Sequence, residues 1–234
     1  MAHQTEAILK LEEKLIRLNY SWQTVKTYKN CFNAFLHYYS TKEVQEISKA
    51  EIESYLVRLV REKGIAPSTQ NQIINAIKFY YEKVLHHPRQ FYNLQRPKKF
   101  KQLPNVLSTQ EVKRIFKVVS NKKHYCMLLA IYACGLRVSE LTRLRVQDIR
   151  SGENLIFIKS GKGKKDRYVP LSAHLLKELR AYYRIYRPDY WHFEGQTGGQ
   201  YSTRSVQNVF RRAVQKAGIN AYCTLHTLRH SYAT

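Results

Sequence analysis

The chain has 234 residues, 44% of them hydrophobic and 24% charged, which is enough for one large domain or two smaller ones with proper cores. Its 40 lysines and arginines outnumber 17 acidic residues, so the formal net charge is +23. This excess is larger than solubility requires and predicts a polyanionic partner. Only 9 glycines and 6 prolines are present, which argues against a disordered basic tail and favours a folded protein.

The sequence has no apolar run of the kind that forms a signal peptide or crosses a membrane, so a cytoplasmic location is expected. No basic helix carries the concentrated aromatic and leucine face that membrane docking needs, and nucleic acid is therefore favoured over an anionic membrane. The cysteines at 31, 126, 134 and 223 lack the close spacing of a metal site. Reduced core thiols are favoured over a disulfide or a metal centre.

The first hundred residues predict four amphipathic helices with short loops, the pattern of a small bundle. Ser48 and Glu51 form a capping box before the third helix, which stops at Gly64, and Pro67 opens the fourth. The four apolar stripes are Ile8, Leu11, Leu15 and Leu18; Val25, Tyr28, Phe32, Phe35, Leu36 and Tyr39; Ile52, Tyr55, Leu56, Leu59 and Val60; and Ile73, Ile74, Ile77, Tyr80, Tyr81 and Val84.

Residues 96–105 (RPKKFKQLPN) combine two prolines with four basic residues and predict a basic interdomain linker between domains at 1–95 and 106–234. In the second domain, Ser108 and Glu111 cap a helix, and residues 123–134 are apolar on nearly every side. Such a helix is expected at a domain centre.

Strand signals occur only in this second half. Residues 154–159 (NLIFIK) and 166–171 (DRYVPL) flank SGKGKK, which predicts a hairpin with a basic tip. Further helices are expected from a cap at Ser172 to about residue 186, over 203–217, and from a cap at Thr224. The expected fold is therefore mainly α, a four-helix bundle followed by an α+β domain with a small antiparallel sheet.

Three segments of the second domain could bring cations together. In GLRVSEL, Arg137 follows Gly135 near the domain centre, where it can bind an anion or pair structurally with Glu140. At the hairpin tip, glycines on both sides of Lys162 allow it close to a phosphate, although a solvated basic turn explains the pattern equally. The Walker A pattern is absent.

The third segment is LHTLRHSYAT at the end of the chain. Its core side is expected to hold Leu225, Leu228 and Tyr232, whereas His226 and Arg229, three apart, lie together beside it. The pair of histidines at 226 and 230 could suggest zinc. Zinc is disfavoured because the segment lacks a glutamate between them and a third ligand.

In this order, the three segments resemble the tyrosine recombinases, or phage integrases, of the Xer-like site-specific type, and the resemblance covers the whole chain. It implies a SAM-like core-binding domain over 1–95 and a catalytic domain over 106–234. It also implies that Arg137, Lys162, His226 and Arg229 are catalytic and that Glu140 supports the site.

The resemblance implies that a tyrosine attacks a DNA phosphodiester, forming a 3′-phosphotyrosine and freeing a 5′-hydroxyl, without a metal or other cofactor. Arg137 and Arg229 would meet the charge on the nonbridging oxygens as planar, permanently charged forks. Lys162 would act as general acid for the leaving 5′-oxygen, and His226 would transfer a proton or orient the phosphate.

The family's nucleophilic tyrosine lies downstream of the HxxR helix, and here the sequence stops at Thr234. The last helix also lacks a C-terminal stop signal. The chain is therefore expected to be truncated at its C-terminus and to lack the nucleophile, with Tyr232 a poor substitute. The segment that family members pass to a neighbouring subunit is also expected to be missing, which makes tetramer formation on DNA doubtful.

Polar helix faces suggest further contacts with double-stranded DNA. Short amides and hydroxyls beside lysine favour a groove-facing surface on the second and fourth helices, and a row of arginines favours backbone contact by the helix at 203–217. The expected residues are Gln23, Lys26, Thr27 and Asn30; Ser68, Asn71, Asn75 and Lys78; and Arg204, Asn208, Arg211 and Arg212.

The leading interpretation is a recombinase or integrase of a mobile element. The alternative is a catalytically inactive DNA-binding module that occupies recombination sites and regulates the full-length enzyme. An RNA-binding protein is disfavoured because no aromatic stacking platform is evident.

Overall fold

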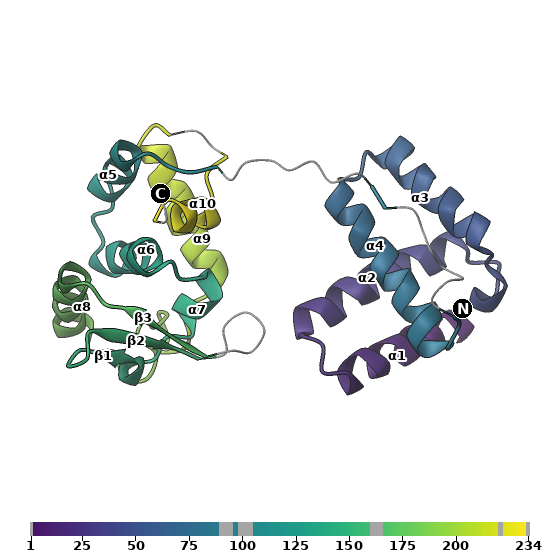
Figure 1. Ribbon diagram of the computed structural model, residues 1–234, viewed down its shortest axis with the longest axis horizontal. Helices are drawn as coiled ribbons and strands as arrows, with labels where there is room; N and C mark the ends of the chain where they lie inside the picture. Colours follow the sequence, from purple (N-terminus) through teal and green to yellow (C-terminus); the bar gives the residue numbers. More distant parts are fainter. Residues whose placement is uncertain (1, 89–95, 98–104, 160–165, 220–221, 233–234) are drawn as a thin grey trace. The chain divides into compact units, whose positions relative to one another are not determined.

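The computed structural model describes residues 2–88, 96–97, 105–159, 166–219 and 222–232. The chain divides into two compact units, Met1–Lys101 and Gln102–Thr234, each with its own hydrophobic core (Figure 1). Lys162 and most of the expected linker lie outside the described residues.

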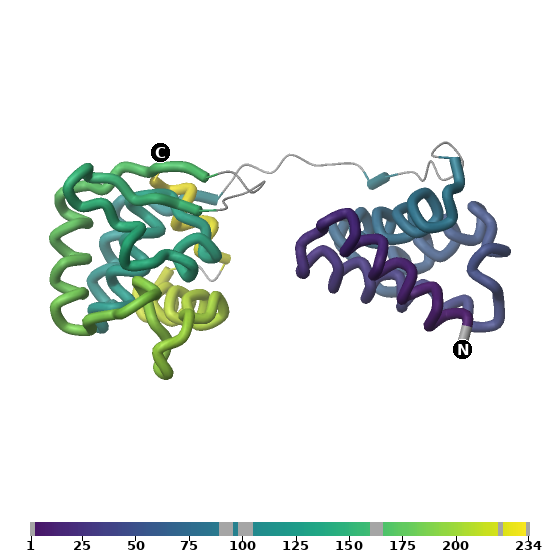
Figure 2. The backbone as a smooth tube through the Cα atoms, turned by 90° about the horizontal axis from the view of Figure 1, so that it is seen from below, coloured from purple at the N-terminus to yellow at the C-terminus, as the bar shows by residue number. Residues whose placement is uncertain are grey.

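The N-terminal unit is the four-helix bundle that the apolar stripes predict. Its helices are α1 (Ala2–Arg17), α2 (Trp22–Tyr38), α3 (Lys49–Lys63) and α4 (Pro67–Phe79), and α4 continues into a π-helical turn, Tyr80–Val84. α2 lies beside α1 in both views and packs on α4 as well (Figures 1 and 2). Phe32, Phe35 and Ile74 are fully buried at its centre.

Local signals set the ends of these helices. Ser48 and Glu51 form the expected capping box at the start of α3, and Gly64 ends the helix with φ at 55°, in the left-handed region that suits glycine. The predicted burial of two stripe residues is wrong, because Leu18 and Val60 are exposed. Leu18 lies beyond the last residue of α1, so the helical period no longer places it.

The C-terminal unit surrounds the buried helix α6 (Lys122–Cys134). The other helices are α5 (Thr109–Lys117), α7 (Val138–Thr142), α8 (Ala173–Tyr186), α9 (Thr203–Lys216) and α10 (Leu225–His230). Figure 1 shows α6 between α8 on one side and α9 with α10 on the other, and α6 packs on all three. The all-round apolar sequence of α6 is therefore explained by partners on several sides.

A three-stranded antiparallel sheet completes this unit, in the order β1 (Ile149–Arg150), β2 (Leu155–Ile158) and β3 (Arg167–Pro170). The β2–β3 pairing, with Ile156 opposite Val169, is the predicted hairpin. The sequence did not predict β1, because two residues are too few to show a strand period. The mainly α fold with a small antiparallel sheet is confirmed.

All four cysteines are unpaired, as the sequence predicted, and Cys126 and Cys134 are buried. Burial raises the pKa of both thiols to about 12, so neither is a thiolate at neutral pH. Among the described residues, none of the helices is long and apolar enough to cross a membrane.

Candidate functional site

Arg137 lies in the short turn that connects α6 to α7. Gly135 caps α6 with φ at 58°, a left-handed conformation, and Leu136 is buried in the core. Arg137 is the N-cap residue of α7. The side chain of Glu140, at the third position of that helix, accepts a hydrogen bond from the backbone N–H of Arg137 at 2.8 Å. This capping box fixes the backbone from which the guanidinium extends.

The Glu140 carboxylate is almost completely buried and is shared by two arginines. Oε1 accepts from Arg137 Nη1 at 2.8 Å and from Arg167 Nη1 at 2.8 Å, and Oε2 accepts from Arg167 Nη2 at 2.7 Å. Burial by itself raises the pKa of a carboxyl group. Here the hydrogen bonds from Arg167 and Arg137 outweigh burial and hold the pKa of Glu140 at about 2.

Arg167 is a site residue that the sequence analysis missed. It opens β3, two residues before the buried Val169, and therefore lies on the core-facing side of the strand. An arginine on a buried strand face needs a carboxylate partner, and this was the available signal. Its partner Glu140 is 27 residues earlier in the chain, so spacing alone does not identify the pair.

The last segment presents His226 and Arg229 from α10. Thr224 and Thr227 form a capping box at the start of this short helix, while Leu225 and Leu228 are buried. The Ser231 hydroxyl accepts from the backbone N–H of Leu107 at 2.7 Å and donates to the Thr227 carbonyl. This bond ties the end of α10 to the first described residues of the unit.

These segments meet at one pocket of about 590 Å³. Arg137 and Ser139 reach it from the start of α7, Gln207 and Arg211 from α9, and His226 and Arg229 from α10. The remaining lining residues are Leu136, Val138, Phe210, Cys223, Thr224 and Leu225. The structure thus brings together three of the four expected catalytic residues, from positions almost a hundred residues apart, and Lys162 lies outside the described residues.

The electrostatics of this pocket are dominated by cations. Burial lowers the pKa of His226, and the neighbouring Arg229, His230 and Arg137 lower it further, so the imidazole is neutral at pH 7. The pKa of Arg229 is also lowered, first by burial and then by Arg137. Burial is the larger cause of both shifts, and repulsion from neighbouring positive charges, which a bound anion would relieve, adds to it.

The structural pairing of Arg137 with Glu140 is confirmed, whereas anion binding by Arg137 stays a prediction. The guanidinium pairs with Glu140 through Nη1, yet its side chain is 30% exposed and lines the pocket. A guanidinium has five N–H donors, so one bond to Glu140 leaves several for a ligand.

Two further expectations about the last segment concern Tyr232 and the pair of histidines. Tyr232 is not in the core: it lies beyond the end of α10, is 54% exposed, and meets the ring edge of Tyr132. The rings of His226 and His230 stack with centroids 5.7 Å apart. Among the described residues, no three His, Cys, Asp or Glu side chains form a group that could hold a metal.

The expected DNA-facing residues of the N-terminal unit differ between its two helices. On α2, Gln23, Lys26 and Asn30 are exposed, while the Thr27 hydroxyl donates to the Gln23 carbonyl at 2.8 Å. Thr27 is therefore partly occupied within its own helix.

On α4, Ser68 is exposed, but the two asparagines are engaged by Arg96, which the sequence analysis had placed in the linker. Arg96 Nη1 and Nη2 donate to Asn71 Oδ1 and Asn75 Oδ1, each at 2.9 Å. Lys78 pairs with Glu82 at 3.3 Å. The polar face of α4 is thus partly covered by an arginine far along the chain.

The expected DNA-facing residues of α9 have different surroundings. Arg211 lines the pocket, whereas Arg212 lies near enough to His124 of α6 to contribute to the lowering of its pKa, after burial and Lys123. Arg204 is exposed and Asn208 is half-buried. Of these four residues, only Arg211 shares a pocket with Arg137 and Arg229.

A helical bundle followed by a helix-rich unit with a three-stranded sheet, and a pocket of arginines with a histidine in that second unit, define the class of the tyrosine recombinases. Sequence comparison agrees: residues 105–234 match the Phage integrase family, and residues 8–90 match the Phage integrase, N-terminal SAM-like domain. The chain belongs to the phage integrase family.

The integrase/recombinase y4qK of Sinorhizobium fredii is 34% identical to this chain over 241 residues, and the match covers 99% of this chain and 77% of that protein. The tyrosine recombinase XerA of Pyrococcus horikoshii is 32% identical over 212 residues, covering 88% and 73%. A lambda integrase tetramer bound to a Holliday junction has a TM-score of 0.80 at 16% identity, covering 98% of this chain and 68% of that one. The last likeness concerns the fold alone.

Proposed function

We propose that this chain binds double-stranded DNA at a recombination site and holds one phosphodiester in the pocket lined by Arg137, His226 and Arg229. The observation that carries the proposal is the convergence of these three residues, from two distant segments, in one cationic pocket. The reaction served by the pocket is site-specific recombination. A tyrosine hydroxyl gives up its proton as its oxygen bonds to phosphorus, the bond from phosphorus to the 5′-oxygen breaks, and that oxygen takes up a proton.

Charge balance supports a phosphate as the ligand. Arg137, Arg211 and Arg229 line the pocket, and Glu140, the carboxylate bound to Arg137, is already shared by two arginines. In the transition state the nonbridging oxygens gain negative charge, and preset guanidinium donors stabilise it without reorganising. By analogy with other preset donors, loss of one costs roughly 100- to 1000-fold in rate.

His226 and Lys162 have different proposed roles. A neutral imidazole can accept a proton or donate a hydrogen bond to the phosphate, and the lowered pKa of His226 keeps that form at pH 7. Lys162 is proposed, from its position in the hairpin motif, as the general acid for the 5′-oxygen.

Arg167 is proposed as a positioning residue for Arg137. Its two N–H groups hold both oxygens of Glu140, and Glu140 in turn fixes the backbone and one guanidinium nitrogen of Arg137. A bidentate arginine–carboxylate pair resists rotation better than a single bond does.

Within the described residues, no tyrosine lines the pocket. We therefore propose that these 234 residues bind and orient the phosphate but do not themselves form the phosphotyrosine bond. The second candidate function follows from this: a DNA-binding module that occupies recombination sites and regulates a complete enzyme. Tetramer assembly on DNA is not part of what we propose for these residues.

A nicked suicide duplex tests both functions. The duplex releases a short oligonucleotide after cleavage, which traps a covalent protein–DNA adduct on a denaturing gel. We expect specific binding, weakening steeply as salt rises, and no adduct.

An adduct would contradict the inactive assignment and support cleavage by the chain itself, and replacing its tyrosines by phenylalanine would then identify the nucleophile. Tighter binding of single-stranded RNA than of duplex DNA at fixed salt would contradict both functions.

A further inference from the structure

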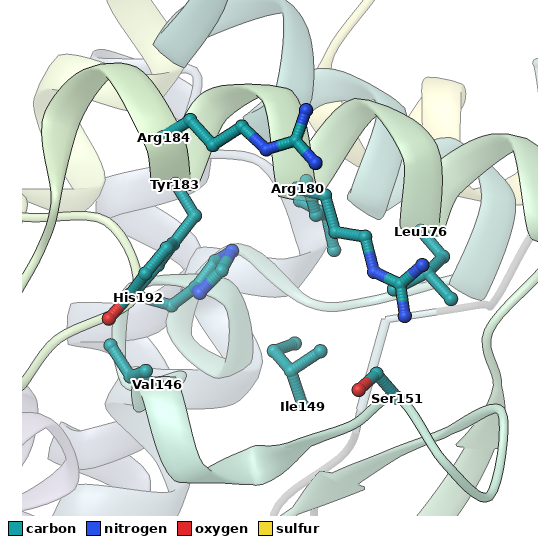
Figure 3. Close-up of a pocket in the computed structure, with 9 residues that line it drawn as sticks. Val146, Ile149, Ser151, Leu176, Arg180, Tyr183, Arg184 and His192 are labelled. Atoms are coloured by element: carbon teal, nitrogen blue, oxygen red, sulfur yellow. The ribbon is translucent and has the colours of Figure 1, made fainter.

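A second pocket, of about 230 Å³, lies on the C-terminal unit between α8 and the segment that contains β1 (Figure 3). None of its lining residues belongs to the Arg137 pocket. Val146, Ile149, Leu176 and Leu179 supply the apolar surface, and Ser151, Arg180, Tyr183, Arg184 and His192 supply the polar groups. The proposed recombination chemistry uses none of these residues.

Two arginines supply the positive charge of this pocket. Arg180 and Arg184 are four residues apart on one face of α8 and both are exposed. Neither guanidinium makes an ion pair within the part of the chain that the structure describes. Figure 3 shows both side chains on the α8 side of the pocket, with Ser151 and Ile149 facing them from the other side.

His192 is the unusual member of the set. It is only 3% exposed, packs edge-on against Tyr182 and Phe193, and has no hydrogen-bond partner for either ring nitrogen among the described residues. Burial lowers the pKa of this imidazole to about 4, so the ring is neutral and carries one donor and one acceptor. Buried polar groups without partners are rare because each loses its bonds to water.

The size and lining of the pocket favour a protein ligand. Small-molecule sites are commonly about 300–1,000 Å³ and enclose most of the ligand, whereas this pocket is smaller and its arginines are exposed. An apolar floor with a rim of arginine and tyrosine is the composition of a protein-binding anchor site. A nucleic-acid backbone has no apolar group to fill the floor.

We propose that this pocket anchors an acidic peptide segment of a partner protein. One apolar side chain enters between Ile149 and Leu176, neighbouring carboxylates pair with Arg180 and Arg184, and the buried ring of His192 closes the floor beneath. The carboxylates follow from charge complementarity, since the chain carries a net charge of +23.

Selection from a displayed random-peptide library on the full 234-residue chain tests the proposal. We expect enriched peptides in which a leucine, methionine or aromatic residue is flanked by Asp or Glu. The double variant Arg180→Glu with Arg184→Glu should bind a synthetic copy of the enriched peptide at least tenfold more weakly, as measured by fluorescence anisotropy. The double variant Lys177→Glu with Arg187→Glu makes the same change of charge outside the pocket, and its affinity for the peptide should fall less than threefold.

His192→Leu separates recognition from packing. Leucine removes the unpartnered nitrogens and keeps the floor apolar, so we expect a higher melting temperature with peptide binding within twofold of the wild-type value. Severalfold weaker binding by this variant would contradict a purely packing role for His192.

The whole proposal is overturned if no acidic apolar motif is enriched, or if both double variants bind the peptide equally. It is also overturned if Arg180→Glu with Arg184→Glu weakens binding of duplex DNA and leaves binding of the peptide unchanged, because the two arginines would then belong to a nucleic-acid surface. Variants of Arg137 or Arg229 should leave peptide binding unchanged, so failure here and failure of the proposed DNA function are distinguishable.

Discussion

The two pockets described above, both on the C-terminal unit, combine arginines with a histidine, but they hold these groups differently. In the first, Arg137 is fixed by the buried Glu140, which Arg167 holds from the other side. In the second, Arg180 and Arg184 extend from an exposed helix face, and none of the described ion pairs includes them.

This difference separates two uses of positive charge. Cations locked on a buried carboxylate keep their geometry before an anion arrives, which catalysis of phosphoryl transfer requires. Exposed arginines must be ordered by their ligand, and this ordering reduces affinity without preventing recognition. The first pocket therefore suits chemistry and the second suits docking.

The largest expected effect comes from removing the carboxylate of the first pocket. The pKa of Glu140 is about 2 in the folded chain and 4.5 as its ordinary value. Because the pKa of Glu140 is lower in the folded chain, its ionised carboxylate stabilises the fold above pH 4.5. This contribution to the free energy of unfolding is lost as the pH falls from 4.5 towards 2. Glu140→Gln should therefore cost about 3 kcal/mol of unfolding free energy at pH 7 by urea titration, with the gap narrowing below pH 4.5.

Asp148→Asn is the matched control, because Asp148 is a similarly buried carboxylate that pairs with Arg145 three residues earlier. Both variants should lose stability, but only Glu140→Gln should also weaken duplex binding. Equal duplex affinity for the two variants would remove the distinction between a site carboxylate and a structural one.

Next in size is the loss of a single phosphate-facing arginine. Arg137→Ala or Arg229→Ala should lower the affinity for duplex DNA about 10- to 100-fold at fixed salt, because a charge-assisted hydrogen bond contributes about 1.5–3 kcal/mol. The duplex for this measurement is one that the wild-type chain has selected from a random pool. Arg137→Ala should remain folded, because Glu140 keeps its two bonds from Arg167 and the backbone bond at position 137.

Arg180→Ala with Arg184→Ala is the comparison for that measurement and should change duplex affinity less than threefold. If the second pocket mattered as much as the first for duplex binding, the contrast between them would fail.

The smallest expected effect tests the support given by Arg167. Arg167→Lys keeps the charge but cannot reproduce the two parallel bonds to Glu140, so duplex affinity should fall about threefold to tenfold. Arg150→Lys is the control, because Arg150 pairs with Glu153 at the surface, at 3.4 Å. Wild-type affinity of Arg167→Lys in the anisotropy titration would show that charge alone is needed there.

Local spacing predicted part of the first pocket. Arg137 was expected after Gly135 and within reach of Glu140, and the structure adds that these two residues form the capping box of α7; these contacts span three to four residues. His226 and Arg229 lie one helical turn apart for the same reason. That these segments share a pocket came from the family resemblance, because periodicity within a segment says nothing about its distance from another.

The sequence by itself determined most of the helices, several of their caps and the β2–β3 hairpin, since each depends on neighbours along the chain. It did not predict α7. Only the tertiary structure decided that Arg167 shares Glu140 with Arg137, that Arg96 covers Asn71 and Asn75, and that His192 is buried without a polar partner. These are contacts between residues far apart in sequence, and they form only when separate elements pack against one another. The physical reason is that local backbone preferences act within a few residues, whereas burial and charge pairing depend on the folded arrangement of the whole unit.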